Sequence, residues 1–204
     1  VDLIYGIPGQ KYDDIEKAVK TICGLHVKHI SLYELTIEKN TPLYQRKLKK
    51  EFSPLSSEFK ADLHDVIDNL LHKHGFVRYE ISNYGVEGYF SRHNLAYWNL
   101  MPYLGLGASA HSMMPIENGI TRFWTERDVN RYIENISTDN LGHSETIEGK
   151  SLYNEILLTG LRTAYGVDTE RCMELTGLNP LKNAGDALQQ LEKKGFIVID
   201  KTNN

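Results

Sequence analysis

The side chains best suited to chemistry in this sequence lie in one run, Arg92-His93-Asn94 followed by Tyr97-Trp98. An imidazole nitrogen with aromatic faces nearby suits ligation of a metal inside a flat macrocycle. Arg92, directly before the histidine, could pair with a carboxylate such as a porphyrin propionate. A lone histidine more often serves as a structural hydrogen-bonding group, so both interpretations stay open on these residues alone.

Asp2 is a second candidate, because it interrupts an otherwise apolar β run at residues 1–5. Burying a carboxylate is costly unless it is paired or hydrogen-bonded. Asp2 therefore either faces water at a strand edge or accepts hydrogen bonds from the hydroxyls or amine of a ligand at the rim of a sheet.

The small-residue loop at 105–110 has the spacing G-x-G-x-x-A of a dinucleotide-binding fingerprint. That fingerprint should end a strand and open a helix, and Met113-Met114-Pro115 do not start one. The loop is therefore interpreted as a place where glycine permits close approach of a strand or of a flat ligand. His111, just after it, is a weaker candidate ligand than His93.

Composition excludes several classes of protein. With 25% charged residues and a net charge of −4, the 204-residue chain does not resemble a nucleic-acid-binding protein that relies on bulk positive charge. Cys23 and Cys172 are too few for an iron–sulfur cluster and do not form a disulfide scaffold, which favours a reducing, cytoplasmic compartment. There is no signal peptide and no apolar run of about 18 residues, so membrane contact is not indicated.

The hydrophobic pattern of the first 82 residues predicts alternating strands and helices, and hence an α/β fold with parallel strands and a right-handed crossover. The expected elements are a strand at 1–5, a helix at 13–25, a strand at 29–37, a helix from Ser53-Pro54 to about His74, and a strand at 76–82.

The rest of the chain predicts a separate, mainly helical module. The expected elements are a strand at 121–123, a helix capped by Thr125, a polar linker at 135–145, helices at 146–165, from Asp168 or Thr169 to Thr176 and at 180–194, and a closing strand at 195–200. Three helices and a strand in so short a segment are typical of a winged helix. The predicted domains are therefore 1–134 and 146–204, joined by the linker.

Five ordered motifs carry a family resemblance: DLIYGIPGQ at 2–10, SLYELTIEKNTPLY at 31–44, YEISNYG at 79–85, SRHNLAYW at 91–98 and YLGLGASAHS at 103–112. Together they resemble the HemN/HemW family, radical S-adenosylmethionine proteins that include oxygen-independent coproporphyrinogen III oxidases. The resemblance covers essentially the whole chain. It implies the C-terminal part of a partial (β/α)6 radical-SAM barrel, followed by the winged-helix-like domain.

The RHNxxYW form at 92–98 resembles the HemW branch, which is associated with heme binding and delivery. The resemblance thus implies a heme chaperone in porphyrin metabolism, with heme or porphyrin as ligand and a heme-acceptor protein that it does not identify. His93 would meet the heme iron, and the neighbouring Arg92, Asn94, Tyr97 and Trp98 would contact the heme. The alternatives are a true coproporphyrinogen III oxidase or a non-enzymatic winged-helix binding module.

The resemblance also concerns S-adenosylmethionine. Asp2 and Ile4 match family positions that contact this cofactor, and Thr36 matches a contact to a second molecule, although its residue type differs from that of the oxidase. The family's CxxxCxxC loop, which holds a [4Fe–4S] cluster, is absent from this sequence. The expectation is a fragment that is inactive alone, with an exposed strand edge at 1–5 through which it could self-associate.

Overall fold

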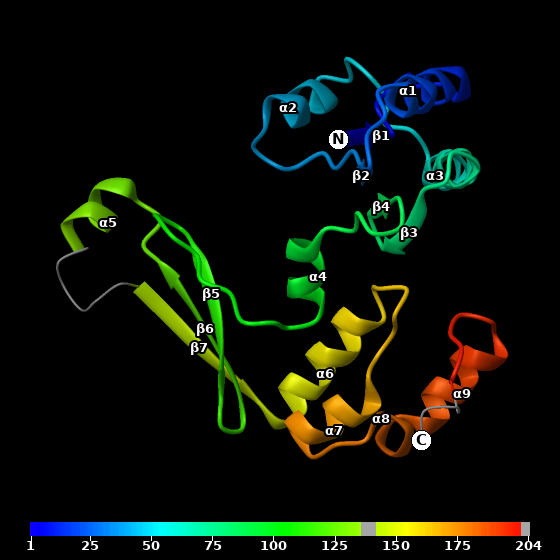
Figure 1. Ribbon diagram of the computed structural model, residues 1–204. Coiled ribbons are helices and arrows are strands. Elements are labelled where there is room, and N and C mark those ends of the chain that lie inside the picture. Colours follow the sequence, from blue (N-terminus) through cyan, green and yellow to red (C-terminus); the bar gives the residue numbers. More distant parts are fainter. Residues whose placement is uncertain (136–141, 201–204) are drawn as a thin grey trace. The chain divides into compact units, whose positions relative to one another are not determined.

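The computed structural model describes residues 1–135 and 142–200, and the chain divides into two compact units, Val1–Arg92 and His93–Asn204 (Figure 1). The division falls between Arg92 and His93, whereas the sequence predicted a linker at 135–145. Part of that segment, 136–141, lies outside the described residues. Asn135 ends helix α5 (Val129–Asn135) and residues 142–145 belong to strand β7 (Gly142–Glu148), so these flanking residues are not linker.

The first unit is built on a mixed sheet in the order β1-β2-β4-β3. Strands β1 (Asp2–Tyr5) and β2 (His29–Glu34) are parallel, which confirms the predicted pairing, although β2 ends earlier than expected. The strand predicted at 76–82 is instead the first arm of a hairpin, in which β3 (Val77–Glu80) pairs antiparallel with β4 (Asn83–Gly85). β4 also pairs antiparallel with β2, so β1 lies at a sheet edge.

Helices α1 (Tyr12–Gly24) and α3 (Ser57–Lys73) pack with the sheet of this unit (Figure 1). Their apolar residues recur every three or four positions, which places them on one helical face. The fully buried members of that face include Ile15 and Val19 on α1 and Leu63, Ile67 and Leu71 on α3. They form one core with the inward residues of β1 and β2.

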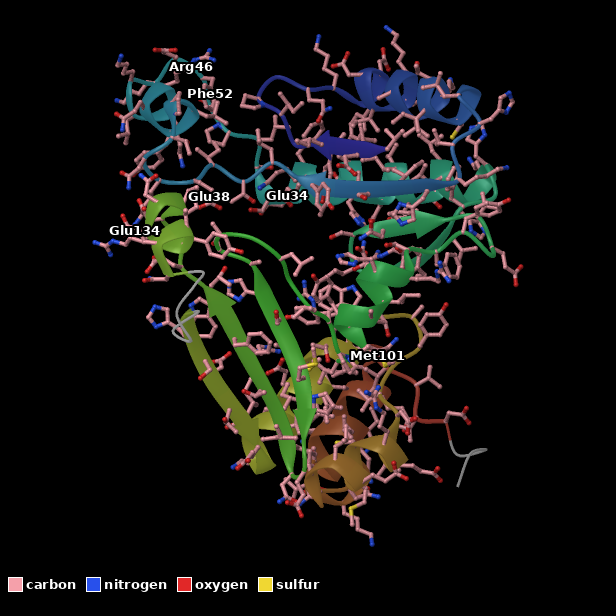
Figure 2. The ribbon with its side chains drawn as sticks, turned by 60° about the vertical axis from the view of Figure 1, so that its left-hand side comes forward. Glu34, Glu38, Arg46, Phe52, Met101 and Glu134 are labelled. Atoms are coloured by element: carbon pink, nitrogen blue, oxygen red, sulfur yellow. The ribbon has the colours of Figure 1, made fainter. Side chains whose placement is uncertain are left out.

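Two local predictions in this unit were wrong. Helix α3 is capped by Ser56, whose Oγ accepts a hydrogen bond from the Phe59 N–H at 3.1 Å, rather than by Ser53 followed by Pro54. The segment after Thr41 was not expected to be helical, yet it forms α2 (Pro42–Leu48). Thr41 caps this helix, and Figure 2 shows Arg46 beside Phe52, with the guanidinium 5.9 Å from the ring centroid.

The second unit contains an antiparallel meander of β5 (His111–Ile116), β6 (Gly119–Thr125) and β7. A two-residue turn joins β5 and β6, since Ile116 pairs with Gly119. Helix α5 follows β6 and is capped by Asp128, whose Oδ1 accepts from the Arg131 N–H at 3.0 Å. Thr125 was the predicted cap. It instead ends β6, and its hydroxyl bonds to the loop at 105–110.

Helix α4 (Arg92–Trp98) begins at the junction of the units, and four helices follow β7: α6 (Gly149–Gly160), α7 (Thr169–Thr176), α8 (Pro180–Asn183) and α9 (Gly185–Lys193). Helix α6 is shorter than the predicted helix at 146–165 because Thr146 pairs with β6 as part of β7. α7 is as predicted: Asp168 caps its start, and Gly177 ends it in the left-handed conformation at φ +69°.

The helix predicted at 180–194 is broken at Ala184, and the closing strand predicted at 195–200 is wrong, since residues 197–200 have no regular secondary structure and pair with no strand in the described part of the chain. The winged-helix assignment stays a prediction. Leu152 of α6 packs with Met113 and Ile120 of the sheet to form the core of this unit. Over residues 1–135 and 142–200, no helix has the length and apolar character needed to cross a membrane.

Candidate functional site

Helix α4 carries the residues that the sequence singled out. His93 and Tyr97 stand one turn apart, as i and i+4, and their rings meet edge to face with centroids 4.8 Å apart. Tyr97 in turn meets Tyr103 edge to face, at 4.6 Å. His93 is exposed and Tyr97 is 41% exposed, so this face of α4 presents an accessible imidazole supported by aromatic rings.

Trp98 is not part of this aromatic contact. Its ring lies 5.1 Å from the Arg162 guanidinium, a cation–π contact with a residue just beyond α6. Asn94 is half-buried and Arg92 is exposed at the end of the first unit. The helix therefore gathers the predicted residues but distributes them over at least two contact surfaces, and their role as a heme site stays a prediction.

A set of polar and charged residues near Tyr103 was not predicted from the sequence. Burial raises the pKa of the half-buried Tyr103, Arg122 opposes this effect, and Tyr97 adds to it. Arg122, on β6, is paired with Glu155 of α6 and lies 3.7 Å from Glu145 of β7. This partly buried ion-pair network ties the sheet to α6.

Asp2 heads a row of polar residues that runs across all four strands of the first sheet. Asp2 is in register with Ser31, Ser31 with Asn83, and Asn83 with Glu80. Asp2 is exposed, whereas Ser31, Asn83 and Glu80 are 8%, 5% and 3% exposed. Paired residues on neighbouring strands project from the same face of a sheet. Of this row, only Asp2 was predicted from the sequence as a candidate site residue.

The buried end of the row has acceptors without donors. Glu80 Oε1 accepts hydrogen bonds from the Asn83 side-chain amide and, at 3.3 Å, from the Ser82 N–H. Glu80 Oε2 and Asn83 Oδ1 are buried and have no hydrogen-bond partner in the described structure. Unpaired buried acceptors are rare in folded proteins because they forfeit their hydration. These two oxygens could accept from a donor group that enters the row.

His29 lies beside this row. Its Nε2 is within hydrogen-bonding distance of the Tyr79 hydroxyl, at 2.7 Å, and the Ser91 N–H donates a hydrogen bond to that hydroxyl at 3.2 Å. Burial lowers the pKa of His29, and the carboxylates of Glu80 and Asp2 partly offset this shift. Ile4 is 47% exposed on β1, and Thr36 is exposed beyond the end of β2. Asp2, Ile4 and Thr36 stay predicted contacts of S-adenosylmethionine.

The loop at 105–110 is explained by the protein's own backbone. Gly105 lies so close to β5 that an added Cβ would stand 2.2 Å from the backbone oxygen of His111. Its N–H donates to Ser112 Oγ at 2.9 Å. A strand rather than a helix follows the loop, so the context of a dinucleotide fingerprint is missing. Of the two interpretations left open, close approach of a strand applies at Gly105.

Gly105→Ala is therefore expected to destabilise the second unit by about 2 kcal/mol, because neither backbone can yield without disturbing the Tyr103–Met113 pairing beside it. Urea unfolding would measure the change. Gly24→Ala is the control, since no atom lies within 4 Å of its added Cβ and its φ is not positive. Equal stability of the two variants would contradict the steric account.

The two cysteines do not fit an iron–sulfur cluster. Cys23 is a half-buried free thiol on α1 and Cys172 is a buried free thiol on α7, in different units. Burial raises the pKa of both thiols, which disfavours the thiolate that binds iron. Among residues 1–135 and 142–200, no group of three or more His, Cys, Asp or Glu side chains could hold a metal ion.

Comparison with known proteins shows which proteins the chain resembles. No family model matches it. The chain is 32% identical over 204 aligned residues to "Heme chaperone HemW" of Bacillus subtilis, covering 97% of this chain and 52% of that protein. It is 28% identical to "Radical S-adenosyl methionine domain-containing protein 1, mitochondrial" of Danio rerio, covering 98% of this chain and 47% of that protein.

The fold is also found in a solved structure. Coproporphyrinogen III oxidase (HemN) from Escherichia coli, described as a radical SAM enzyme, matches with a TM-score of 0.74 at 17% identity, over 98% of this chain and 49% of the oxidase. The chain thus spans about half the length of the proteins that it matches. These similarities, together with the five ordered motifs, show that the chain belongs to the HemN/HemW family of radical S-adenosylmethionine proteins.

Proposed function

We propose that this chain is part of a heme-binding chaperone, and that His93 is the residue through which it ligates heme iron. The observation that carries the proposal is the exposed imidazole on α4, with the Tyr97 ring held against it at 4.8 Å. An accessible, neutral imidazole is the protein ligand that heme iron most often takes. The curated relatives named as heme chaperones support the same function.

Hemin titration tests this proposal. His93→Ala is expected to abolish the shift of the Soret band and to weaken hemin binding on the order of tenfold or more, since the loss even of an outer-shell partner commonly has that effect. His111→Ala is the matched control, because His111 is also exposed and belongs to the same unit, where it stacks on Trp124. A spectrum unchanged in His93→Ala, or changed equally by His111→Ala, would disprove the assignment.

S-adenosylmethionine is implied by the family. The carboxylate of Asp2 would accept hydrogen bonds from this cofactor at the exposed end of the polar row, with Ile4 beside it on β1 and Thr36 beyond β2. The cofactor supplies a 5′-deoxyadenosyl radical when a reduced cluster cleaves it. Since the cysteines of this chain do not fit that cluster, no radical step is assigned to its residues.

The oxidase alternative shares this fold, but no specific feature of the described residues favours it over heme binding. Self-association through β1 also stays a proposal. It is motivated by the position of β1 at a sheet edge and by Val1 and Ile4, which are 51% and 47% exposed.

A further inference from the structure

The sheet of the second unit has an open edge along its last strand, β7. The strand order is β5-β6-β7, and Figure 1 shows β7 as the outer strand of this meander. In the described parts of the chain, 1–135 and 142–200, no strand pairs with β7 on the side opposite β6. All seven residues of β7 pair with β6, so this edge is longer than a typical strand of about five or six residues.

The hydrogen bonds of β5 show in which direction its backbone groups point. Met113 exchanges both of its backbone hydrogen bonds with Tyr103, at 2.9 and 3.0 Å, so its N–H and C=O point away from β6. Backbone groups alternate in direction along an antiparallel strand, so those of the next residue, Met114, point toward β6. Thr121 lies opposite Met114, and its N–H and C=O therefore point toward β5.

The same alternation determines which backbone groups of β7 face the open edge. Because Thr121 bonds to β5, the next residue, Arg122, bonds to β7, where it lies opposite Glu145. The Glu145 C=O agrees with this direction, since it accepts a hydrogen bond from the Thr121 hydroxyl at 3.3 Å. The residues on either side, Ser144 and Thr146, therefore point their N–H and C=O away from β6. Both are exposed, and these four groups have no neighbouring strand to bond to among the described residues.

Strand β7 lacks the features that commonly protect an edge strand. Its register with β6 is continuous over its seven residues, without a bulge, and its sequence, GHSETIE, contains neither proline nor lysine. An edge of this kind can accept an extended segment of another chain, whose main chain hydrogen-bonds to it and adds a strand to the sheet.

The charges on β7 distinguish a second copy of this chain from a different partner. In the antiparallel self-pairing that overlaps the whole strand, the Glu145 side chains of the two copies lie opposite each other. Residues directly opposite on neighbouring strands have Cβ atoms about 5 Å apart, and like charges there are destabilising. Glu148 adds a second exposed carboxylate, and Arg122, which lies 3.7 Å from Glu145, is shared with Glu155. The edge therefore disfavours its own copy and favours a basic segment.

We propose that the open edge of β7 binds an extended, basic segment of another protein as an additional antiparallel strand, with a lysine or arginine opposite Glu145. Antiparallel pairing is the form that β7 already makes with β6, and it is the more stable ladder per residue. The N–H and C=O groups of Ser144 and Thr146 hold the main chain of the segment, and the carboxylates of Glu145 and Glu148 select its charge. This surface does not involve His93 or heme, so the inference goes beyond the proposed function.

A capped peptide that matches the seven residues of β7 tests the inference. It carries lysine opposite Glu145 and Glu148, and threonine or valine elsewhere. Amide hydrogen exchange is followed while the peptide is titrated into the protein. The Ser144 and Thr146 N–H groups are expected to exchange freely without the peptide and about tenfold more slowly, or slower still, at saturating peptide. The N–H of Glu145, which already bonds to β6, should change less.

Two control peptides separate strand addition from simple attraction between charges. In the first, glutamate replaces both lysines, and the peptide should bind about tenfold more weakly because two favourable cross-strand pairs become repulsive. The second keeps both lysines but carries N-methyl groups on the amides that face β7. It retains the charge and loses the donors, and should also bind about tenfold more weakly.

A matched pair of variants tests the same contact from the side of the protein. Ser144→Pro removes one N–H that faces the open edge, at a position where edge strands accept proline, and should bind the lysine peptide about tenfold more weakly. Ser144→Ala keeps this N–H and should bind the peptide as the parent protein does. The N-methylated peptide decides the question even if Ser144→Pro does not fold.

Four results would overturn the inference: no binding of the lysine peptide, equal binding of its N-methylated form, equal affinity of the folded Ser144→Pro and Ser144→Ala variants, or protection of the Ser144 and Thr146 amides in the dilute protein without peptide. Protection that instead rises with protein concentration, together with a dimer in sedimentation, would assign the edge to a second copy and also overturn it. None of these results bears on the hemin titration of His93→Ala, which tests the proposed function separately.

Discussion

Asn83→Asp is expected to destabilise the protein by about 3 kcal/mol at neutral pH, because it places a second carboxylate against the buried carboxylate of Glu80. The Asn83 amide now donates to Glu80 Oε1, and the two side chains are 5% and 3% exposed. After the substitution there is no donor between them unless one carboxyl keeps its proton. Two carboxylates in contact in a site this dry cannot both ionise.

The stability of Asn83→Asp is expected to fall as pH rises. The carboxyl pair binds a proton more tightly in the folded protein than in the unfolded chain, so folding takes up a proton and stability falls as pH rises above about 4. The free energy of unfolding of the variant should be close to that of the parent protein near pH 4 and should differ from it most near pH 7. Urea unfolding followed by circular dichroism at both pH values would measure the difference.

Asn69→Asp is the matched control for this substitution. Asn69 is exposed on α3, where its amide donates only to the Asp65 carbonyl at 2.8 Å. Its replacement should change the free energy of unfolding by less than about 0.5 kcal/mol. If the two variants lost the same stability, or if the loss in Asn83→Asp did not depend on pH, the buried pairing of Glu80 with Asn83 would be refuted.

The elements that the sequence predicted well are those with a local signal. The βαβ unit follows from apolar periods of two and about 3.6, and α7 from its capping residues, Asp168 and Gly177. Strand β7 gives no such signal, because all but one of its seven residues are exposed and only pairing with β6 specifies it. The start of α3 was misplaced because Ser53-Pro54 and Ser56 are competing caps, and only Ser56 is used.

The contacts of the candidate site likewise differ in whether a local sequence signal predicts them. His93 and Tyr97 are one helical turn apart, so their contact could be anticipated from spacing. Trp98 precedes the three strands of the second sheet in the sequence and Arg162 follows them, so no local sequence pattern predicts their contact. The acceptors of Glu80 and Asn83 come together through the register of β3 and β4, a short hairpin where a single strand was predicted.

Leu152→Ala is expected to destabilise the second unit by about 2–5 kcal/mol. Leu152 is fully buried, and it links α6 to Met113 of β5 and Ile120 of β6, which are 1% and 4% exposed. The cost combines the lost transfer of the side chain from water with the void it leaves, which neighbours fixed by strand pairing cannot fill. Both tryptophans, Trp98 and Trp124, lie in this unit, so their fluorescence during urea unfolding reports its stability.

Leu158→Ala makes the same chemical change on the same helix at a residue that is 64% exposed, and should alter stability by less than about 0.5 kcal/mol. The difference between the two leucines isolates the contribution of burial from that of helix propensity, because both helix positions gain the same alanine. Similar losses in both variants would mean that the sheet and α6 do not share the core centred on Leu152. A loss confined to Leu152→Ala, with an unchanged dependence on urea concentration, is the result that this core requires.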